Sequence, residues 1–313
     1  MNKTALVTGG KGFIGSHLCE LLTQSGYKVV IYDFNTYATQ YIDETKLKNI
    51  TSFFGDVTNF KGLAEVIDVI KNIDVVFHLA AESHVDNSID TPNKFISTNI
   101  IGTFNVIELC RQREIPLVYI STDEVYGSID ESCYSIAWNE ECNISPNSPY
   151  SASKASGDLL ALSYIHTYKC DIKITRCCNN FGTGQHIEKL IPKSITTALR
   201  DKTIDIYGDG KNIRQWVHVT DHCKGILLTH LKGTPGEIYN IGNHNLLTNN
   251  EIAKLVIKAT NNDVSIRYIE DRLGHDEMYH VNYNKIQKLG YKPVKSIEDP
   301  DIWHEMVQYY KKY

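Results

Sequence analysis

The feature that most constrains how this chain can fold is a glycine-rich turn close to its start. Ala5-Leu6-Val7-Thr8 predicts a short apolar strand, Gly9, Gly12 and Gly15 follow, and Ser16 to Leu22 has the apolar spacing of a helix. Glycines let the backbone turn tightly and approach a pyrophosphate, which then lies at a helix N-terminus. Because a strand and a helix flank the turn in the required order, the sequence predicts a dinucleotide-binding site.

An acidic residue at the end of the second predicted strand favours NAD over NADP. Asp33 follows the strand Lys28–Tyr32 and stands 18 residues after Gly15, about where a carboxylate bonds the adenosine ribose hydroxyls. A carboxylate there repels a 2′-phosphate. The alternative interpretation is that Asp33 only caps a turn. Asp56, after the third predicted strand, is a candidate to face the adenine.

Strands and helices alternate through the first half of the chain, which predicts an α/β fold with a doubly wound parallel sheet. Beyond this half the alternation breaks, and Cys178–Gly184 is predicted to be a loop. We therefore expect an NAD-binding Rossmann domain over residues 1–176, with later returns near 215–242. Residues 177–313 are expected to form mainly a smaller α+β lobe that binds the substrate.

Composition and charge exclude several classes of partner. The formal net charge is −5, which argues against generic binding to nucleic acid or to acidic membranes. No apolar stretch approaches the roughly 18 residues of a membrane span, and no secretory signal precedes the first strand. The eight cysteines lack metal-finger spacing. We expect reduced thiols, no metal site and a cytoplasmic location.

Two further stretches carry groups suited to catalysis. Ser121-Thr122-Asp123-Glu124-Val125-Tyr126-Gly127 follows the apolar strand Leu117–Ile120, and ligands bind outside the carboxyl ends of strands in open α/β sheets. Tyr150 and Lys154 stand four residues apart at a predicted helix start, so they share one face. An ammonium beside a phenol lowers the pKa of the phenol, which makes Tyr150 a candidate base for an alcohol proton. We expect the two stretches to form one active site.

Together these residues resemble the short-chain dehydrogenase/reductase family in its extended branch. The run Thr8–Gly15 and the Tyr150/Lys154 pair match the pattern of that branch, and Thr122 occupies the place of its assisting Ser or Thr. The run Thr122-Asp123-Glu124 is similar to that of nucleotide-sugar 4,6-dehydratases. Further stretches that fit this group are Ala80–Asp86, Asn179–Gly182, Glu188–Pro192, Tyr207–Gly210, Asn212–Arg214, Tyr239–Gly242 and Asp271–His275.

The resemblance implies a reaction. Sugar C4 is oxidised to a ketone, Glu124 removes the acidified C5 proton, and Asp123 protonates the departing C6 hydroxyl. Hydride then returns to C6, so NAD is regenerated and stays bound. Two neighbouring carboxyls can hold different protonation states, because each raises the cost of ionising the other. The alternative for Asp123-Glu124 is a solvated loop that happens to carry two acids.

The resemblance also implies which residues bind cofactor and substrate. The cofactor-side positions are Gly9, Gly12, Phe13, Ile14, Gly15, Asp33, Asp56, Val57, Leu79, Ala80, Ala81, Thr98, Tyr150, Lys154 and Asn180. The substrate-side positions are Ser83, Thr122, Asn179, Lys189, Leu190, Asp205, Tyr207, Arg214, Asn249, Asp271, Arg272 and His275. Arg214 is the implied pyrophosphate clamp, since a guanidinium binds two oxygens at once.

Several departures from the group leave the substrate open. Asp205, Gln215 and Leu273 differ from the residues common in these dehydratases, and all lie near the expected nucleotide or sugar end. The base (thymine or uracil), the C2 substituent and the C5 outcome therefore stay undecided. The runner-up is a UDP-N-acetylglucosamine 4,6-dehydratase that also inverts C5. A more distant alternative is a non-catalytic NAD-binding regulator, although such proteins usually lose Tyr150 or Lys154.

Two long predicted helices bear on assembly. The segments Asn93–Arg113 and Tyr150–Tyr168 resemble the pair of helices through which the family forms dimers. The resemblance therefore implies a homodimer.

Overall fold

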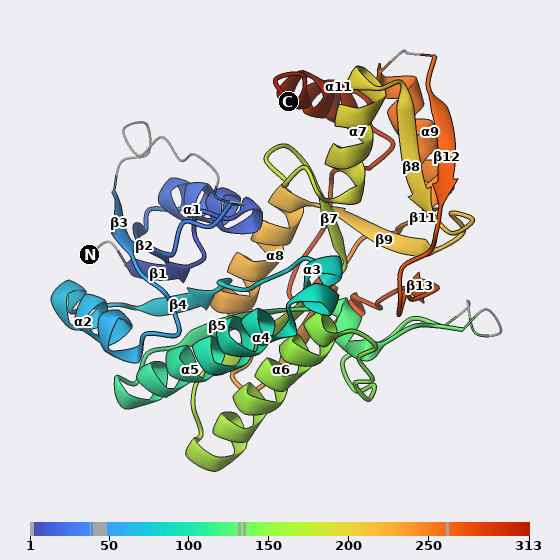
Figure 1. The fold of residues 1–313 in the computed structure, drawn as a ribbon. Helices are drawn as coiled ribbons and strands as arrows, with labels where there is room; N and C mark the ends of the chain where they lie inside the picture. Colours follow the sequence, from blue (N-terminus) through green and yellow to red (C-terminus); the bar gives the residue numbers. More distant parts are fainter. Residues whose placement is uncertain (1–2, 38, 40–48, 131–132, 134–135, 261–262) are drawn as a thin grey trace.

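The structure is a computed structural model that describes residues 3–37, 39, 49–130, 133, 136–260 and 263–313. Its centre is a seven-stranded sheet of parallel strands in the order β10-β6-β5-β4-β1-β2-β3 (Figure 1). These strands are β1 (Thr4–Thr8), β2 (Lys28–Asp33), β3 (Ile50–Phe54), β4 (Val75–His78), β5 (Leu117–Thr122), β6 (Ile172–Cys177) and β10 (Ile238–Ile241). The predicted doubly wound parallel sheet is confirmed.

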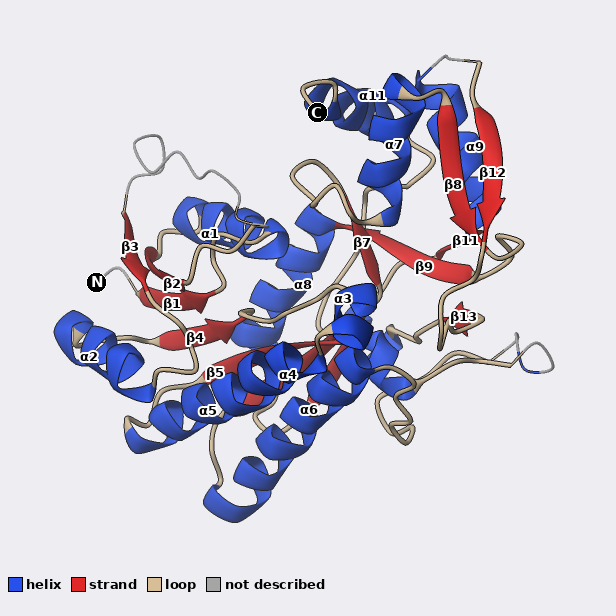
Figure 2. Cartoon of the chain, in the orientation of Figure 1, coloured by secondary structure: helices blue, strands red, loops and turns tan. Residues whose placement is uncertain are grey.

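Helices cover both faces of this sheet (Figure 2). One face carries α1 (Phe13–Gln24) and α8 (Val219–Lys232), and the other carries α2 (Phe60–Ile70), α5 (Thr103–Gln112) and α6 (Pro149–Tyr168). As a result β4, β5 and β6 are buried at every residue. Strands buried on both faces are read from the sequence as continuous apolar runs, which is why they could be predicted.

The strand order reverses between β1 and β4, which lie side by side but are followed by strands on opposite sides of the sheet. In open α/β sheets the crevice outside the carboxyl ends at this point binds ligands. The glycine turn leaves β1 there, and the segments after β4 and β5 leave their strands beside it. The topology thus gathers the predicted motifs at one edge.

The helix predicted over Asn93–Arg113 is not uniform. A π-helical segment, Ile96–Gly102, separates α4 (Pro92–Phe95) from α5. Such wider turns are rare in proteins, and those that occur are often found at functional sites. Sequence periodicity did not predict it, because one extra residue in a turn barely disturbs the apolar spacing.

The smaller lobe lies at the upper right of Figure 1. It contains two sheets. One is a pair of parallel strands, β8 and β12, and the other has four strands, in which β7, β11 and β13 each pair with β9. Its strands are β7 (Asn179–Phe181), β8 (Thr203–Tyr207), β9 (Ile213–His218), β11 (Asn245–Thr248), β12 (Ser265–Ile269) and β13 (Met278–Tyr279). Its helices α7 (Leu190–Arg200), α9 (Asn249–Thr260) and α11 (Pro300–Tyr310) pack around a separate apolar core.

The prediction of a loop over Cys178–Gly184 was wrong, because this segment contains β7. β7 has three residues, two of them asparagines, and it becomes a strand only by pairing with β9. The strands β11, β12 and β13 were also not predicted. Within the range 215–242, α8 and β10 return to the large sheet while the end of β9 belongs to the smaller lobe.

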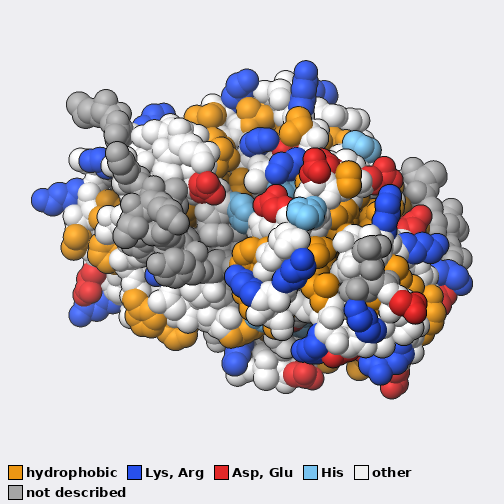
Figure 3. All heavy atoms as spheres, turned by 90° about the horizontal axis from the view of Figure 1, so that it is seen from above, with side chains coloured by type: hydrophobic (Ala, Val, Ile, Leu, Met, Phe, Trp, Pro, Cys, Tyr) orange, Lys and Arg blue, Asp and Glu red, His pale blue; other side chains and the backbone are white. Residues whose placement is uncertain are grey.

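Two surveys of the described ranges bear on partners. None of the helices there has the length and apolarity to cross a membrane. No group of three or more His, Cys, Asp or Glu side chains in those ranges is arranged to hold a metal ion. On the face seen in Figure 3, Lys and Arg side chains are interspersed with Asp and Glu.

Candidate active site

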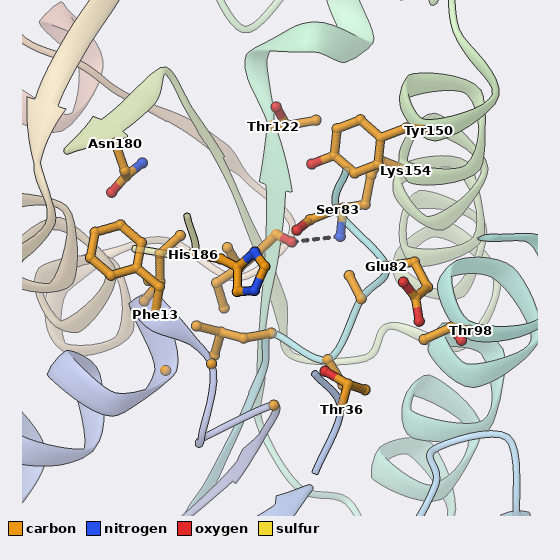
Figure 4. A pocket seen from close by; sticks show the side chains of 18 of the residues that line it. Phe13, Thr36, Glu82, Ser83, Thr98, Thr122, Tyr150, Lys154, Asn180 and His186 are labelled. Carbon is orange, nitrogen blue, oxygen red and sulfur yellow. Dashed lines mark hydrogen bonds between the residues drawn. The ribbon is translucent and has the colours of Figure 1, made fainter. Parts of the chain in front are cut away.

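A cavity of about 360 Å³ lies outside the carboxyl ends of the central strands. Every predicted cofactor-side residue lines it, and so do all five predicted catalytic residues, Thr122, Asp123, Glu124, Tyr150 and Lys154. In Figure 4, Tyr150 projects from α6 toward Thr122 at the end of β5 and Lys154 reaches β5 below it, while Phe13 and Asn180 lie on the far side of the cavity. The two stretches that the sequence analysis joined therefore meet in one site.

The glycine turn fits tightly against the neighbouring backbone. Gly9 has a φ of +70°, and a Cβ there would lie 2.6 Å from the backbone nitrogen of Ala80. A Cβ on Gly15 would collide with the carbonyl oxygen of Gly9. The Asp33 carboxylate accepts a hydrogen bond from the backbone N–H of Lys11 at 2.9 Å, so the acid after β2 also orders the turn after β1. At Gly9 and Gly15, only glycine allows the backbone to approach its neighbours this closely.

The π-helical segment connects the cofactor side of the cavity to the catalytic helix. It brings Thr98 to the cavity wall and buries Asn99 completely. The Asn99 amide nitrogen donates to the carbonyl of Glu82 at 3.0 Å and to the Ser153 hydroxyl at 2.8 Å, while its oxygen accepts from the Glu82 N–H at 2.9 Å. One side chain thus ties the segment after β4 to α6.

Thr122 ends β5, and Asp123 and Glu124 begin a single 3₁₀ turn, Asp123–Tyr126. The Thr122 hydroxyl donates to Asp123 Oδ1 at 3.2 Å and accepts from the Glu124 N–H at 3.3 Å. Thr122 therefore acts as the N-cap of the turn. This capping fixes both carboxyls at the cavity wall.

The two carboxyls occupy different electrostatic environments. Asp123 is 2% exposed, and its Oδ2 has no hydrogen-bond partner among the described residues; burial and then the charge of Glu124 raise its pKa well above the usual range. Burial also raises the pKa of Glu124, but the positive charges of Arg272, Lys189 and Arg214 oppose this. Asp123 is therefore suited to hold a proton and Glu124 to remain ionised.

The Tyr150/Lys154 pair stands at the start of α6, where Ser148 and Ser151 form a capping box. Lys154 Nζ donates to the carbonyl of Ile120 at 2.8 Å, and burial lowers the pKa of Lys154 to about 8 against the opposing charge of Asp158. Burial raises the pKa of Tyr150, with Glu124 adding to the rise and a hydrogen bond with Thr122 opposing it. The expectation that Lys154 lowers the pKa of Tyr150 is not met, because desolvation of the phenolate dominates.

Part of the predicted substrate side joins the cavity. Ser83, Asn179 and Lys189 line it. Lys189 Nζ donates to the Ser83 carbonyl at 2.7 Å, which connects the segment before α7 to the segment after β4. The two lobes thus meet across the cavity through this contact.

A second polar cluster surrounds Asp86 in α3 (Val85–Asp90). Arg272 Nη1 lies 3.4 Å from one Asp86 oxygen, and the Tyr207 hydroxyl donates to the other at 3.3 Å. The Nε of Arg272 is buried without a hydrogen-bond partner among the described residues. His275 packs edge-on to Tyr207 and lies 2.6 Å from the carboxylate of Asp271. Four predicted residues, from β8 and from the segment Asp271–His275, therefore converge with α3 here.

The predicted clamp, Arg214, is 5% exposed. Its Nη atoms donate to the carbonyls of Ile213, Glu277 and Asp276 at 2.8 to 3.1 Å, and its guanidinium lies 4.4 Å from the centroid of the Tyr279 ring. Protein groups therefore already occupy much of its donor capacity. Its role toward a pyrophosphate stays a prediction.

The remaining predicted substrate residues do not line the cavity. Asp205 forms a two-pronged ion pair with Arg267 on β12, with both N–O distances 2.8 Å. Leu190 packs against the core of the smaller lobe. Asn249 is buried at the start of α9. Their roles also stay predictions.

The cavity has further lining residues that sequence reasoning missed. Tyr37 donates to Glu188 Oε1 at 3.3 Å and accepts from Asn87 Nδ2 at 3.1 Å, so it joins the segments after β2 and before α7. Others are Phe34, Thr36, Glu82, Ser121, Cys177, Cys178, Gln185, His186 and His222. Cys177 could have been found from the sequence because it ends a predicted strand, as Thr122 does. The two residues pair at the same edge of the sheet.

A family model described as GDP-mannose 4,6 dehydratase matches residues 6–300 of the chain. The chain belongs to this family. The dTDP-glucose 4,6-dehydratase of Streptomyces niveus is 40% identical to it over 318 residues, which cover 98% of this chain and 92% of the relative. The family resemblance drawn from the motifs is therefore confirmed.

Solved structures of similar proteins agree with this family assignment. A dTDP-glucose 4,6-dehydratase from Streptomyces venezuelae with NAD bound matches this chain with a TM-score of 0.90 at 40% identity, covering 99% of this chain and 97% of that one. A UDP-glucose 4-epimerase from Thermotoga maritima matches with a TM-score of 0.89 at 26% identity, covering 99% of both chains. Dehydratases and epimerases share the fold, so the residues of the site must separate the two reactions.

Proposed function

We propose that this protein is an NAD-dependent nucleotide-sugar 4,6-dehydratase that converts an NDP-hexose to an NDP-4-keto-6-deoxyhexose. One observation carries the proposal: two adjacent carboxyls, one buried and one facing three cations, stand beside Thr122 and Tyr150 in a single cavity. An oxidation and its reversal alone need no such pair. A dehydration needs both an acid and a base.

The residues present fit NAD. The glycine turn leaves no room for a side chain at Gly9 and Gly15, and Asp33 stands at the cavity wall, where its carboxylate suits ribose hydroxyls and opposes a 2′-phosphate. The solved relative from Streptomyces venezuelae contains NAD. When bound, NAD supplies a hydride acceptor for sugar C4 and the hydride that C6 later receives. Gly9, Gly12, Gly15 and Asp33 would hold it.

The protein side chains then move the protons. For this step Tyr150 acts as the phenolate, with the charged Lys154 beside it, and its oxygen accepts the proton of the C4 hydroxyl as the ketone forms, assisted by the Thr122 hydroxyl. Glu124 takes the proton from C5, which the new ketone has acidified, and the C6–O bond breaks as Asp123 donates its proton, so water leaves. Glu124 returns a proton to C5 when C6 is reduced. The net change is the loss of one water molecule from the hexose.

The substrate end fits an anionic diphosphate. Lys189, Arg272 and Arg214 bring positive charge to the side of the cavity that Glu124 faces, although the whole chain is acidic. Guanidinium groups suit phosphate oxygens. We propose that Ser83 and Asn179 contact the sugar, and that the Asp86 cluster and the segment from Asp205 to Tyr207 lie toward the nucleoside.

A panel of nucleotide hexoses tests the proposal. Purified protein is incubated separately with dTDP-glucose, UDP-glucose and UDP-N-acetylglucosamine in deuterated water, and the products are identified by NMR. We expect a 4-keto-6-deoxy product from at least one of them, with deuterium at C5. Inverted stereochemistry at C5 would identify the C5-inverting enzyme instead. A product changed only at C4 would identify an epimerase. No product from any substrate would identify a non-catalytic NAD-binding protein.

We also propose a homodimer formed through the long helices. Ile96 and Ile101 in the π-helical segment and Leu159 in α6 are each about half exposed, and Phe104 and Tyr168 add to this apolar surface. Large apolar side chains that gather on neighbouring helices mark interaction surfaces. Light scattering should give twice the chain mass of 35.5 kDa, and Leu159→Glu should give the monomer.

Two smaller proposals complete the assignment. We propose a cytoplasmic location, where reduced thiols are the rule; Cys19, Cys110, Cys142, Cys170, Cys177, Cys178 and Cys223 are free thiols. We also propose residue 176 as the division between the NAD-binding domain and the substrate lobe, because β6 ends one residue later, at Cys177, and the next strand, β7, belongs to the smaller sheet.

A further inference from the structure

Lys154 has an unusual environment for a buried cation. It is 4% exposed, and within the described ranges it forms no ion pair with a carboxylate. The one hydrogen bond that its ammonium donates within those ranges is to the Ile120 carbonyl at 2.8 Å. Asp158, one helical turn along, is already paired with Arg176 at 2.8 Å.

An aromatic ring provides the missing contact. Lys154 Nζ lies over the ring of Tyr119, 4.3 Å from its centroid. Tyr119 is fully buried in β5, and its hydroxyl donates to the backbone carbonyl of Lys154 at 3.3 Å. A cation this close to a ring face is attracted by the ring quadrupole, and the attraction grows when both groups are removed from water.

The ring itself is held in place. It stacks on His78 with centroids 5.7 Å apart and planes inclined by 26°. Both nitrogens of His78 bond hydroxyls, Nδ1 to Thr8 at 2.7 Å and Nε2 to Thr103 at 3.0 Å. Contacts other than the one with Lys154 therefore fix the orientation of the Tyr119 ring.

The other charged and titratable groups near Lys154 contribute little attraction. His78 on β4 is neutral, because burial and then the charge of Lys154 lower its pKa to about 3. Tyr150 on α6 is a neutral phenol, since burial raises its pKa. Asp158 on α6 is paired with Arg176 on β6, and its charge still favours the Lys154 ammonium, although burial outweighs it. The Tyr119 ring face and the Ile120 carbonyl are the groups that contact the ammonium directly among the described residues.

We propose that Tyr119 is a positioning residue, whose ring keeps the Lys154 ammonium charged and directed at the cavity in place of a carboxylate. The inference deepens the proposed function, since it assumes that a charged Lys154 serves Tyr150. A ring suits this place better than an acid, because a carboxylate beside Lys154 would also oppose ionisation of the Tyr150 phenol.

A series of ring-fluorinated phenylalanines at position 119 tests the proposal, because fluorine weakens the quadrupole while preserving the shape. The titration of Lys154 is followed by NMR of lysine labelled with ¹³C at Cε, its signal identified by its loss in Lys154→Met. Tyr119→Phe should keep the wild-type midpoint. Successive fluorines should lower it, by about one pH unit for the fully fluorinated ring, and Tyr119→Met should match that ring.

The matched control places the same fluorinated residues at Phe77 on β4, which is buried beside His230; the Lys154 midpoint should not move. An unchanged midpoint across the series at position 119 overturns the proposal. So does an equal fall in Tyr119→Phe, which would assign the effect to the hydroxyl. The NMR midpoints do not depend on turnover, so a failure of the proposed dehydration would be visible separately.

Discussion

The cavity and the smaller lobe hold their polar side chains in different ways. In the residues that line the cavity, some polar atoms are left unpaired: the Ser121 hydroxyl and Oδ2 of Asp123 are buried without partners among the described residues. In the smaller lobe, several predicted binding residues have a charged partner, as Asp205 has Arg267 and Asp271 has His275, although the Nε of Arg272 is buried without a partner among the described residues. The reacting groups of the cavity are held in place before a substrate binds, whereas the charged pairs of the smaller lobe can give up their partners to a ligand.

This difference suggests that the reaction and the choice of substrate are encoded separately. A reacting group must be held in place before the substrate arrives, so Thr122, Asp123 and Tyr150 stand on a strand, a turn and a helix of the rigid sheet. A paired surface residue can change partners at small cost. Substitutions in the cavity should therefore affect turnover, and substitutions in the smaller lobe should affect mainly which nucleotide is accepted.

The largest effect is expected for Tyr150→Phe, which removes the base for the C4 hydroxyl. Proton transfer of this kind contributes about 10²- to 10⁴-fold to rate, so turnover should fall by at least that much. Loss of the 4-keto product and of any NADH absorbance after substrate is added would be the readout. Tyr164→Phe, on the same helix but bonded to Glu108, is the matched control. Normal turnover in Tyr150→Phe would remove the phenol from the mechanism.

The next effect separates the two carboxyls. Glu124→Gln and Asp123→Asn should each permit C4 oxidation but slow the loss of water, by about 10²-fold or more. NADH should therefore accumulate on the enzyme and be visible by absorbance in rapid mixing. Only Glu124→Gln should also abolish exchange of the C5 hydrogen with deuterated water. If Asp123→Asn stops that exchange and Glu124→Gln does not, the two roles are reversed.

The pH dependence should show both environments. Burial lowers the pKa of Lys154 to about 8, so this side chain becomes neutral above about pH 8 and the rate should fall there. Burial raises the pKa of Glu124 above its ordinary value, so the base is lost as the pH falls through this raised pKa. A profile of kcat against pH should be bell-shaped. Undiminished activity well above pH 8 would mean that a charged Lys154 is not needed.

The contrast between the regions also explains what the sequence could predict. The strands of the large sheet were predicted because continuous apolar runs and a glycine turn are local patterns. β7 and β13 were not, because pairing with β9 defines them. Thr122, Asp123 and Glu124 were predicted from their motif. Their unequal environments were not, since Lys189 and Arg272 approach Glu124 only in the folded chain.

The smallest effect is expected for the Asp205–Arg267 pair, and it tests the smaller lobe directly. Arg267 is mostly exposed, so Asp205→Asn should leave the melting temperature and kcat nearly unchanged. If this pair lies beside the nucleoside, the variant should change KM for UDP- and dTDP-hexoses unequally, by less than about tenfold. Asp201→Asn, which breaks the neighbouring surface pair with Arg200, should change neither. Equal shifts for both nucleotides in Asp205→Asn would place base recognition elsewhere in the lobe, and a large loss of kcat would contradict the separation of reaction from substrate choice.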